Sequence, residues 1–492
     1  MSLQQQTLKG IKWNTLATVV NAVMQIGYTS VMARLLGPAE FGLVAAGQVV
    51  LRFGSYFSEM GMGKAIIQKA DITERDVRAA FTLAGALGLL FYAIFFVAVA
   101  PLVPSLVLDT PSVVPVVRLM ALSFVFTGFT STATNLLRRQ LRFEALAKID
   151  IISFIISYGC VGVGMAYSGY GVWSLVGATL SQNLCTGLFA YLVARHSVIP
   201  VVNKSDYLPL LGYGSRMSLI GFLEFFSANV DTFMIGRLLG ARPLGIYGRA
   251  FLLVQLPVQN LVTSVSRVLF PALSSIQNDV DRLRRIYLMA ERMVAFVILP
   301  LCTGLAVAAP EVVGTLLGPK WTEAIPIIRI LAFVVPFKLL MNFAGIVCDA
   351  TGRLNVKIIF ETTYIVVLAT IMYFFTRQYG LPGIALTILA GEGLKMAAYS
   401  IFMSRVLHFR LAGDLLSGFV PATITAILVG VALFATRRAL PASIIDMPLL
   451  ALAIEGFAGA AALAIGIMLP TSKAIRQEIL ARLRPERTAV VG

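Results

Sequence analysis

Long apolar stretches of about 20 residues follow one another along most of the 492-residue chain, separated by short polar connections. A helix needs about 20 mostly apolar residues to cross the hydrocarbon core of a bilayer. The pattern therefore predicts an all-α integral membrane protein with about fourteen transmembrane helices. The predicted spans cover residues 10–34, 39–62, 79–101, 113–137, 148–168, 171–194, 209–236, 244–270, 286–309, 322–349, 355–376, 381–404, 414–436 and 447–469.

Composition agrees with this pattern, because 58% of the residues are hydrophobic and the mean hydropathy is +0.85. Only 13% are charged, against about 25% in typical soluble domains. Fourteen spans take up roughly 300 residues, which leaves no room for a separate soluble catalytic domain. The N-terminus lacks a short apolar run ending in a small-residue cleavage site, so we expect the first helix to be retained.

The net charge of +16 would favour a nucleic-acid partner in a soluble protein, but here the position of each charge matters more. The connections on the N-terminal side and the C-terminal tail hold 25 lysines and arginines, against 8 on the opposite side. The positive-inside rule then places both termini in the cytoplasm, which requires an even number of spans. Arg437 and Arg438 run against this distribution. Topology thus accounts for the basic excess without nucleic acid.

An internal repeat divides the chain. Residues 34–42 read RLLGPAEFG and residues 237–245 read RLLGARPLG, so five identities recur at an offset of 203. A weaker echo at an offset of 209 relates Lys148 to Lys357 and the pair Tyr170-Gly171 to Tyr379-Gly380. Spans one to six are therefore expected to be duplicated as spans seven to twelve, in parallel topology about an axis along the membrane normal.

This duplication predicts the domain organisation. We expect an N-lobe at 1–203, a C-lobe at 204–410, two additional spans at 411–470 and a basic cytoplasmic tail at 471–492.

Polar residues recur at helical spacing within several apolar spans. Asn14, Thr18, Asn21 and Gln25 lie on one side of the first span, and Gln48, Arg52, Ser55 and Glu59 repeat that spacing in the second. Further polar positions are Gln255 and Gln259 in span eight, Lys338 in span ten, and Glu392 and Lys395 in span twelve. A polar side chain in hydrocarbon must face protein or water, so these stripes mark helix contacts or a cavity.

Charged residues in the spans are the stronger candidates for a cavity, because each costs about 2.5–3.5 kcal/mol at mid-bilayer. The offset of 203 carries Asn21 onto Glu224 and Tyr28 onto Asp231, so span seven presents acids. An alternative remains for one pair, since Glu392 and Lys395 lie three residues apart and can neutralise each other.

Several chemistries find no support in the sequence. The nearest approach to a phosphate-binding loop, SEMGMGKA at 58–65, has Ser58 and Ala65 where glycine and serine or threonine are required. The two histidines, His196 and His408, lie far apart in predicted loops, so no metal site or catalytic triad is expected. We expect no cofactor, no metal and no catalytic residue.

The opening LKGIKWNTLATVVNAVMQIGYTSVMARLLGPAEFGLVA, the second RLLG segment and about fourteen spans in two lobes resemble a known family. The chain is similar to Wzx-type polysaccharide or O-antigen flippases of the multidrug/oligosaccharidyl-lipid/polysaccharide exporter superfamily. The resemblance implies alternating-access movement of an undecaprenyl-diphosphate-linked oligosaccharide to the periplasmic leaflet of the bacterial inner membrane. It also implies a role in exopolysaccharide or lipopolysaccharide synthesis, with a polymerase and a chain-length regulator as candidate partners.

With this resemblance the stripes receive candidate roles. A cationic cavity suits a diphosphate and acidic sugars, and amides suit sugar hydroxyls. The acids are candidates for binding a coupling proton or sodium ion. The candidate substrate-binding residues are Arg52, Lys338, Arg249, Lys395, Asn21, Gln25, Gln48, Gln255 and Gln259, and the candidate ion-coupling residues are Glu59, Glu224 and Asp231.

Three alternatives stay open at this point. The chain can be a multidrug cation antiporter of the same superfamily, relying on acids such as Glu224 and Asp231. It can be a lipid II flippase, which also carries an anionic diphosphate lipid. From a different class, it can be a membrane-embedded enzyme acting on polyprenyl-linked sugars, although no large loop offers an acceptor-binding domain.

Overall fold

Helices make up the regular structure of the part of the chain that the computed structural model describes, which confirms the predicted all-α class. Contacts divide the chain into two units, Met1–Gly248 with Leu316–Lys320, and Arg249–Thr315 with Trp321–Gly492. The predicted boundary between the N-lobe, ending at 203, and the C-lobe, starting at 204, falls outside the described residues, so the lobe boundaries remain a prediction. The structure describes residues 3–58, 72–201, 225, 229–255, 273, 276–277, 279–351, 353–445, 447–473 and 476–477.

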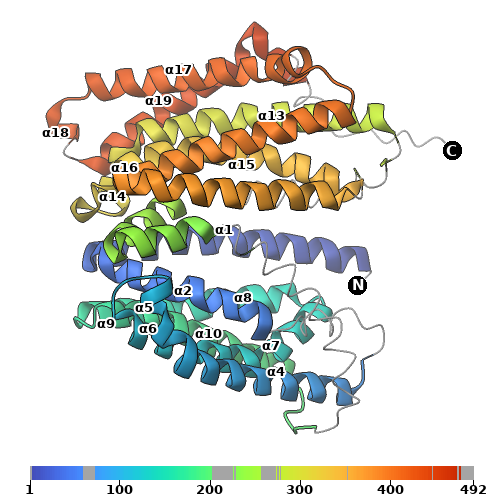
Figure 1. Cartoon of the computed structure of the whole chain (residues 1–492), viewed down its shortest axis with the longest axis vertical. Helices are drawn as coiled ribbons and strands as arrows, with labels where there is room; N and C mark the ends of the chain where they lie inside the picture. Colours follow the sequence, from blue (N-terminus) through green and yellow to red (C-terminus); the bar gives the residue numbers. More distant parts are fainter. Residues whose placement is uncertain are drawn as a thin grey trace. The chain divides into compact units, whose positions relative to one another are not determined.

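The first unit is a bundle of long helices (Figure 1). Helix α4 packs on α7, α7 on α10, and α1 on α8. Short π-helical turns interrupt two of the spans, at η1 and η2. The elements are α1 (Leu3–Leu35), α2 (Pro38–Ser58), α4 (Glu74–Ile94), η1 (Phe95–Val99), α5 (Ala100–Leu106), α6 (Val113–Met120), α7 (Leu122–Arg139), α8 (Phe143–Phe154), η2 (Ile155–Gly162), α9 (Val163–Tyr167) and α10 (Val172–Ala194), with helical segments at 229–239 and 241–248.

Side chains fix where two of these helices begin. Helix α2 opens on Pro38, which suits the first helical position, and the Glu40 carboxylate accepts a hydrogen bond of 3.0 Å from the Gly37 amide. Before α4, the Thr73 hydroxyl accepts from the Asp76 amide while the Asp76 carboxylate accepts from the Thr73 amide. This capping box satisfies amide groups that no helical carbonyl reaches.

The two copies of the RLLG segment meet within the first unit, at the start of α2 and of the helix at 241–255. A Cβ on Gly42 would lie 1.8 Å from the Ala241 carbonyl oxygen, and a Cβ on Gly245 would lie 1.8 Å from the Pro38 carbonyl oxygen. The offset of 203 relates Gly42 to Gly245 and Pro38 to Ala241, so the two contacts are reciprocal. Neither position has space for any side chain.

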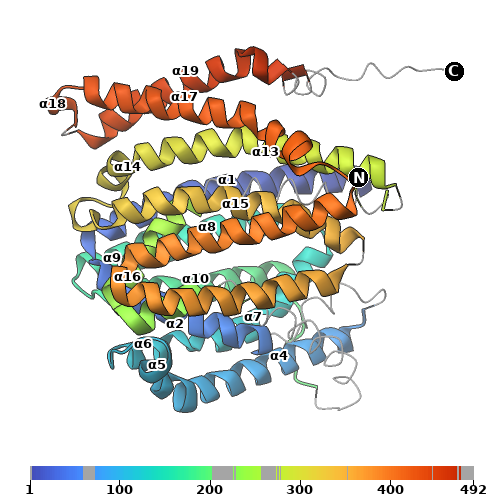
Figure 2. The same ribbon diagram turned by 45° about the horizontal axis from the view of Figure 1, so that its top comes forward.

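The second unit holds the remaining long helices, in which α13 packs on α15 and α17, α15 on α16, and α17 on α19 (Figure 2). Its elements are the segment 249–255, α13 (Val280–Val307), α14 (Ala309–Leu316), η3 (Pro319–Trp321), α15 (Ala324–Ala350), α16 (Leu354–Val406), η4 (Leu411–Leu416), α17 (Ser417–Ala439), α18 (Ala442–Ile445), α19 (Pro448–Met468) and η5 (Pro470–Ser472), of which the last residue of α14 and the first two of η3 belong to the first unit.

Helix α16 is two spans in one element. A straight helix of 53 residues would be about 80 Å long, far more than the roughly 30 Å of a hydrocarbon core. Gly380 interrupts it with φ 60° and ψ −142°, between the predicted spans 355–376 and 381–404. Gly171, its counterpart at the offset of 209, has φ 54° and ψ −128°. The weaker sequence echo is therefore matched by the same non-helical backbone conformation in both copies.

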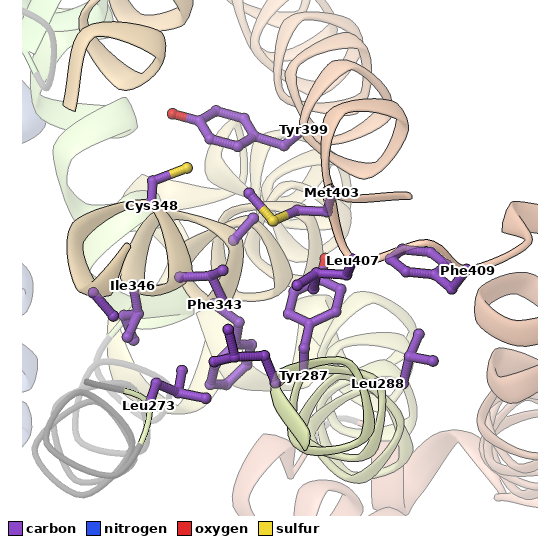
Figure 3. Packing of buried hydrophobic residues seen from close by; sticks show 14 of the residues in the cluster. Leu273, Tyr287, Leu288, Phe343, Ile346, Cys348, Tyr399, Met403, Leu407 and Phe409 are labelled. Atoms are coloured by element: carbon purple, nitrogen blue, oxygen red, sulfur yellow. The ribbon is translucent and has the colours of Figure 1, made fainter. Parts of the chain in front are cut away.

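A tightly packed apolar cluster fills the end of the second unit where α13 begins and α15 and α16 end (Figure 3). Phe343 and Cys348 of α15 face Tyr399 and Met403 of α16, with Tyr287 of α13 beside them. These side chains are buried to 2% exposure or less. Apolar and aromatic packing therefore holds the three helices together at this end of the unit.

Nine helices in the described residues are long and apolar enough to cross a membrane, one of them being Val356–Val406. The predicted spans 39–62 and 171–194 correspond to α2 and α10, which have 21 and 23 residues but are not among the nine. Large parts of the predicted spans 209–236 and 244–270 lie outside the described residues. The membrane-spanning class is confirmed, and the count of fourteen remains a prediction.

The reciprocal glycine contact predicts a stability effect. Gly42→Ala and Gly245→Ala each place a methyl group against a backbone carbonyl, so we expect each to lower the free energy of unfolding by about 1–3 kcal/mol. Gly248→Ala is the matched control, because nothing lies within 4 Å of a Cβ there, one turn after Gly245. The melting temperatures of the purified variants measure the effect. Equal melting temperatures for Gly42→Ala and Gly248→Ala would show that the close approach does not exist.

Candidate functional site

The predicted polar residues of the first unit lie on α1 and α2. Asn21 and Gln25 are half-buried on α1, and the Asn21 side-chain oxygen has no hydrogen-bond partner in the described structure. Gln48 and Arg52 are exposed on α2. No carboxylate among the described residues lies within ion-pair distance of the Arg52 guanidinium, so within that part of the chain Arg52 is available to an external anion.

Asp231, by contrast, is held by donors from its own helical segment and from the next one, at 241–248. The Tyr247 hydroxyl donates a short hydrogen bond to Asp231 Oδ2. The Thr232 amide and hydroxyl donate to Oδ1 over 2.7 Å and 3.3 Å. Both carboxylate oxygens are thus engaged, and Tyr247 itself is buried. An ion reaching Asp231 would have to compete with these three donors.

The second unit contains a charged network between α15 and the two limbs of α16. The Lys338 ammonium on α15 lies 3.5 Å from Glu392 Oε1 on the second limb. The Tyr364 hydroxyl on the first limb donates to the same oxygen over 2.8 Å. The Glu392 side chain is 4% exposed whereas that of Lys338 is 39% exposed. The acid is therefore buried, and its base faces the surroundings.

A second ion pair joins the same two limbs of α16. The Lys395 ammonium lies 2.6 Å from Glu361 Oε1 and 4.4 Å from the centre of the Tyr364 ring. The Lys395 side chain is only 7% exposed. Phe251, on the segment 249–255, completes the surroundings, with its ring centre 5.4 Å from the Lys338 ammonium. Tyr364 thus contacts both pairs, through its hydroxyl and through its ring.

Toward the end of α15, Lys357 and Asp349 form a third pair at 3.2 Å. The three lysines and three acids of these pairs cancel in formal charge. Burial of an unpaired charge is costly, so neutral pairing allows six charged groups to remain in apolar helices. The three pairs are neutral as a set, and Lys338 is the most exposed of their bases.

The structure answers the question left open for Glu392 and Lys395. Each finds its partner on another helix segment, Lys338 and Glu361 respectively. Glu361 and Tyr364 were missed by the sequence analysis, although the rule that charges in spans are costly applies to Glu361 as well. Tyr364 gives no comparable signal, because an aromatic residue in an apolar helix usually serves packing.

The structure describes only some of the remaining candidate residues. Arg249 and Gln255 are half-buried on the segment 249–255 of the second unit. Gln259, Glu59 and Glu224 lie outside the described residues, so nothing is added to their predicted roles. Among the described residues, no group of three or more His, Cys, Asp and Glu side chains is arranged to hold a metal ion.

Comparisons with known proteins agree on one family. A family described as "Polysaccharide biosynthesis protein" matches residues 31–326. The lipopolysaccharide biosynthesis protein WzxC of Escherichia coli strain K12 is 25% identical over 363 residues, which are 73% of each chain. The teichuronic acid biosynthesis protein TuaB of Bacillus subtilis strain 168 is 26% identical over 363 residues, covering 73% of this chain and 74% of that protein.

A solved structure shows the same fold. The lipid II flippase MurJ in its inward closed conformation matches with a TM-score of 0.73, covering 96% of this chain and 100% of that chain at 12% sequence identity. Such low identity supports a common architecture only. The family match covers more than half of the sequence, and it includes the first RLLG segment, the second copy and the glycines that join them. The chain therefore belongs to the polysaccharide biosynthesis protein family.

Proposed function

We propose that this protein moves a polyprenyl-diphosphate-linked oligosaccharide from the cytoplasmic to the periplasmic leaflet of the bacterial inner membrane. The movement proceeds by alternating access between the two repeated lobes, at 1–203 and 204–410, and serves polysaccharide synthesis. Family membership supports the pathway, and the likeness to the fold of a lipid II flippase supports the transport architecture. In this proposal both termini lie in the cytoplasm and the chain performs no catalysis.

The observation that carries the proposal is the position of Lys338. Its ammonium faces outward from an apolar helix yet keeps a buried counter-ion, Glu392, at 3.5 Å. An incoming diphosphate can attract the exposed ammonium without leaving it uncompensated in the absence of cargo. Charge-assisted hydrogen bonds to phosphate are stronger than neutral ones, so this site favours an anionic headgroup over a neutral sugar.

Arg52 supplies the corresponding cation in the first unit. It is exposed on α2, and a guanidinium binds phosphate through two parallel hydrogen bonds. Asn21, Gln25, Gln48, Gln255 and Gln259 are proposed to bind sugar hydroxyls, and Arg249 is proposed to add to the cationic set.

Lys395 is buried against Glu361, so we assign it to holding the limbs of α16 together rather than to contacting cargo. Glu59, Glu224 and Asp231 remain the proposed sites of ion coupling.

Alternating access also requires contacts that open at one end of the molecule. In the first unit, Arg34 and Arg237, the arginines of the two RLLG segments, each contact a loop that belongs to the other repeat copy. The Arg237 guanidinium donates to the Pro104 carbonyl over 3.3 Å and lies 3.7 Å from Asp109. In the other direction, the Lys320 ammonium donates to the Arg34 carbonyl over 3.3 Å. We propose that this reciprocal latch holds the end opposite the termini closed and breaks when cargo is released.

The transport proposal is tested in cells that lack the gene but keep the polymerising machinery. We expect a complete polyprenyl-diphosphate-linked repeat unit to accumulate on the cytoplasmic leaflet, as measured by mass spectrometry of extracted lipids. The intact gene and Lys148→Ala, which alters an exposed pair, should reverse the accumulation, and Arg52→Ala should not.

Other outcomes of that experiment identify the alternatives. An unchanged lipid pool with greater sensitivity to cationic drugs indicates a multidrug antiporter. Lethality with accumulation of lipid II indicates a peptidoglycan role. A covalent change in the glycolipid when the purified protein is added indicates an enzyme.

Paired substitutions separate binding from folding in the second unit. Lys338→Gln with Glu392→Gln keeps the unit neutral but removes the exposed ammonium, so we expect flipping to fall about 10- to 100-fold, the equivalent of about 1.5–3 kcal/mol. Lys395→Gln with Glu361→Gln is the matched control and should retain flipping, because that pair is buried. The rates are measured with a fluorescent lipid-linked sugar in vesicles, beside the melting temperatures. An equal loss of flipping rate in both double variants would show that Lys338 does not bind the cargo.

The latch makes a separate prediction. Arg237→Ala removes the contacts to Pro104 and Asp109, and because this pair is largely exposed we expect a shift of about 1 kcal/mol, or roughly fivefold, toward the open state. Pulsed electron spin resonance between labels on Ser112 and Arg242 reports that population as a longer distance. Arg118→Ala is the control, because Arg118 bonds Phe96 of its own repeat copy. An unchanged distance distribution in Arg237→Ala would refute the latch.

A further inference from the structure

Three ionisable side chains meet between α14, α17 and α19 of the second unit. They are Glu311 at the start of α14, Arg437 in the last turn of α17, and Glu455 two turns into α19. A Cβ on Gly314 of α14 would lie 3.2 Å from the Pro448 ring at the start of α19, so these helices pack closely there. The site thus connects the two C-terminal spans, which have no repeat copy, to the repeated part of the chain.

The site is buried and its hydrogen bonding is incomplete. The Glu455 side chain is 1% exposed and that of Glu311 is 4% exposed. The Arg437 Nε lies 3.3 Å from Glu311 Oε1. Neither Glu455 oxygen has a hydrogen-bond partner in the described part of the chain, and the same holds for Glu311 Oε2. Three buried carboxyl oxygens are therefore unsatisfied acceptors that a proton or a cation could satisfy.

Few other charges surround this site. Glu311 and Arg437 are the groups that act electrostatically on the Glu455 carboxyl. Helix α19 carries no other ionisable side chain, and the remaining one on α17, Arg438, stacks on Phe434 at 4.9 Å. Helix α14 contributes only Glu311, and the described residues of α18 and η5 contribute none. Two carboxylates against one guanidinium leave a net charge of −1.

A buried net charge is not tolerated in apolar surroundings, so one positive charge must be added. Hard metal cations take about six or more oxygen ligands, whereas three oxygens are available here. A single proton on one of the two carboxyl groups gives a neutral set. The acid that lacks the guanidinium then holds the proton.

We propose that Glu455 and Glu311, with Arg437 as their shared counter-ion, form a proton-binding site of the two C-terminal spans. Uptake of one proton from water converts the set from a charge of −1 to neutral, and release reverses the change. When Arg437 moves from Glu311 to Glu455, the proton is transferred to Glu311. Coupling of this exchange to cargo movement rests on the proposed transport function, whereas proton binding does not.

Glu455→Gln is the sharpest variant, because an amide has the size of the protonated acid and should fold normally. In the full chain reconstituted in vesicles, infrared difference spectra between acidic and alkaline buffer should show a protonated carboxyl band that this variant loses. Glu74→Gln, which alters an exposed acid at the start of α4, should keep the band. The melting temperature of the wild type should fall as the pH rises and Glu455 ionises, and that of Glu455→Gln should fall less.

A second pair of variants tests the role of the guanidinium. Arg437→Gln should hold one more proton than the wild type at the same pH, and Arg438→Gln should not. A band unchanged in Glu455→Gln, or a melting temperature that responds to sodium rather than to pH, overturns the proposal. If the wild type flips no lipid but the band is lost in Glu455→Gln, the proton site stands and the transport function fails. If a pH gradient accelerates lipid flipping equally in the wild type and in Glu455→Gln, the coupling of proton exchange to cargo movement is refuted.

Discussion

The reciprocal contact between the starts of α2 and the helix at 241–255 is the constraint on which the first unit depends. Backbone meets backbone at Gly42 and Gly245, with the carbonyls of Ala241 and Pro38 in the space where side chains would be. Without a hydrophobic driving force between helices in lipid, close packing of small residues is what joins them. An internal duplication supplies both halves of this contact from one ancestral segment, in the way that a twofold interface pairs one surface with itself.

Charge satisfaction is the second constraint, and it separates the two units. In the second unit each of the three lysines of the network has a carboxylate partner, so none of these helices holds an uncompensated buried charge at those positions. Arg52 has no such partner among the described residues of the first unit. A ligand that carries negative charge therefore gains most where a base is exposed, at Arg52 and at Lys338, and least at Lys395.

The sequence was sufficient for the helical class, the repeat and the break at Gly380, because each depends on local composition or on identity between copies. It located Lys338, Glu392 and Lys395 through the cost of charge in a span, but not their partners. Pairing depends on which limbs of α16 lie side by side, and a helical period carries no information about that. Tyr364 shows the limit most clearly, since its hydroxyl contacts Glu392 of one ion pair and its ring contacts Lys395 of the other.

Divergence between the copies explains how a duplicated fold can treat its cargo asymmetrically. The offset that superposes Gly42 on Gly245 carries Arg52 onto Gln255 and Gln48 onto Phe251. One copy therefore presents a cation and an amide where the other presents an amide and an aromatic ring, beside which Lys338 supplies a cation from α15. Duplication conserves the glycines because backbone packing leaves them no alternative. Positions 48, 52, 251 and 255 are not held by such a backbone contact. The two copies can therefore carry different side chains there and bind different parts of one amphipathic lipid.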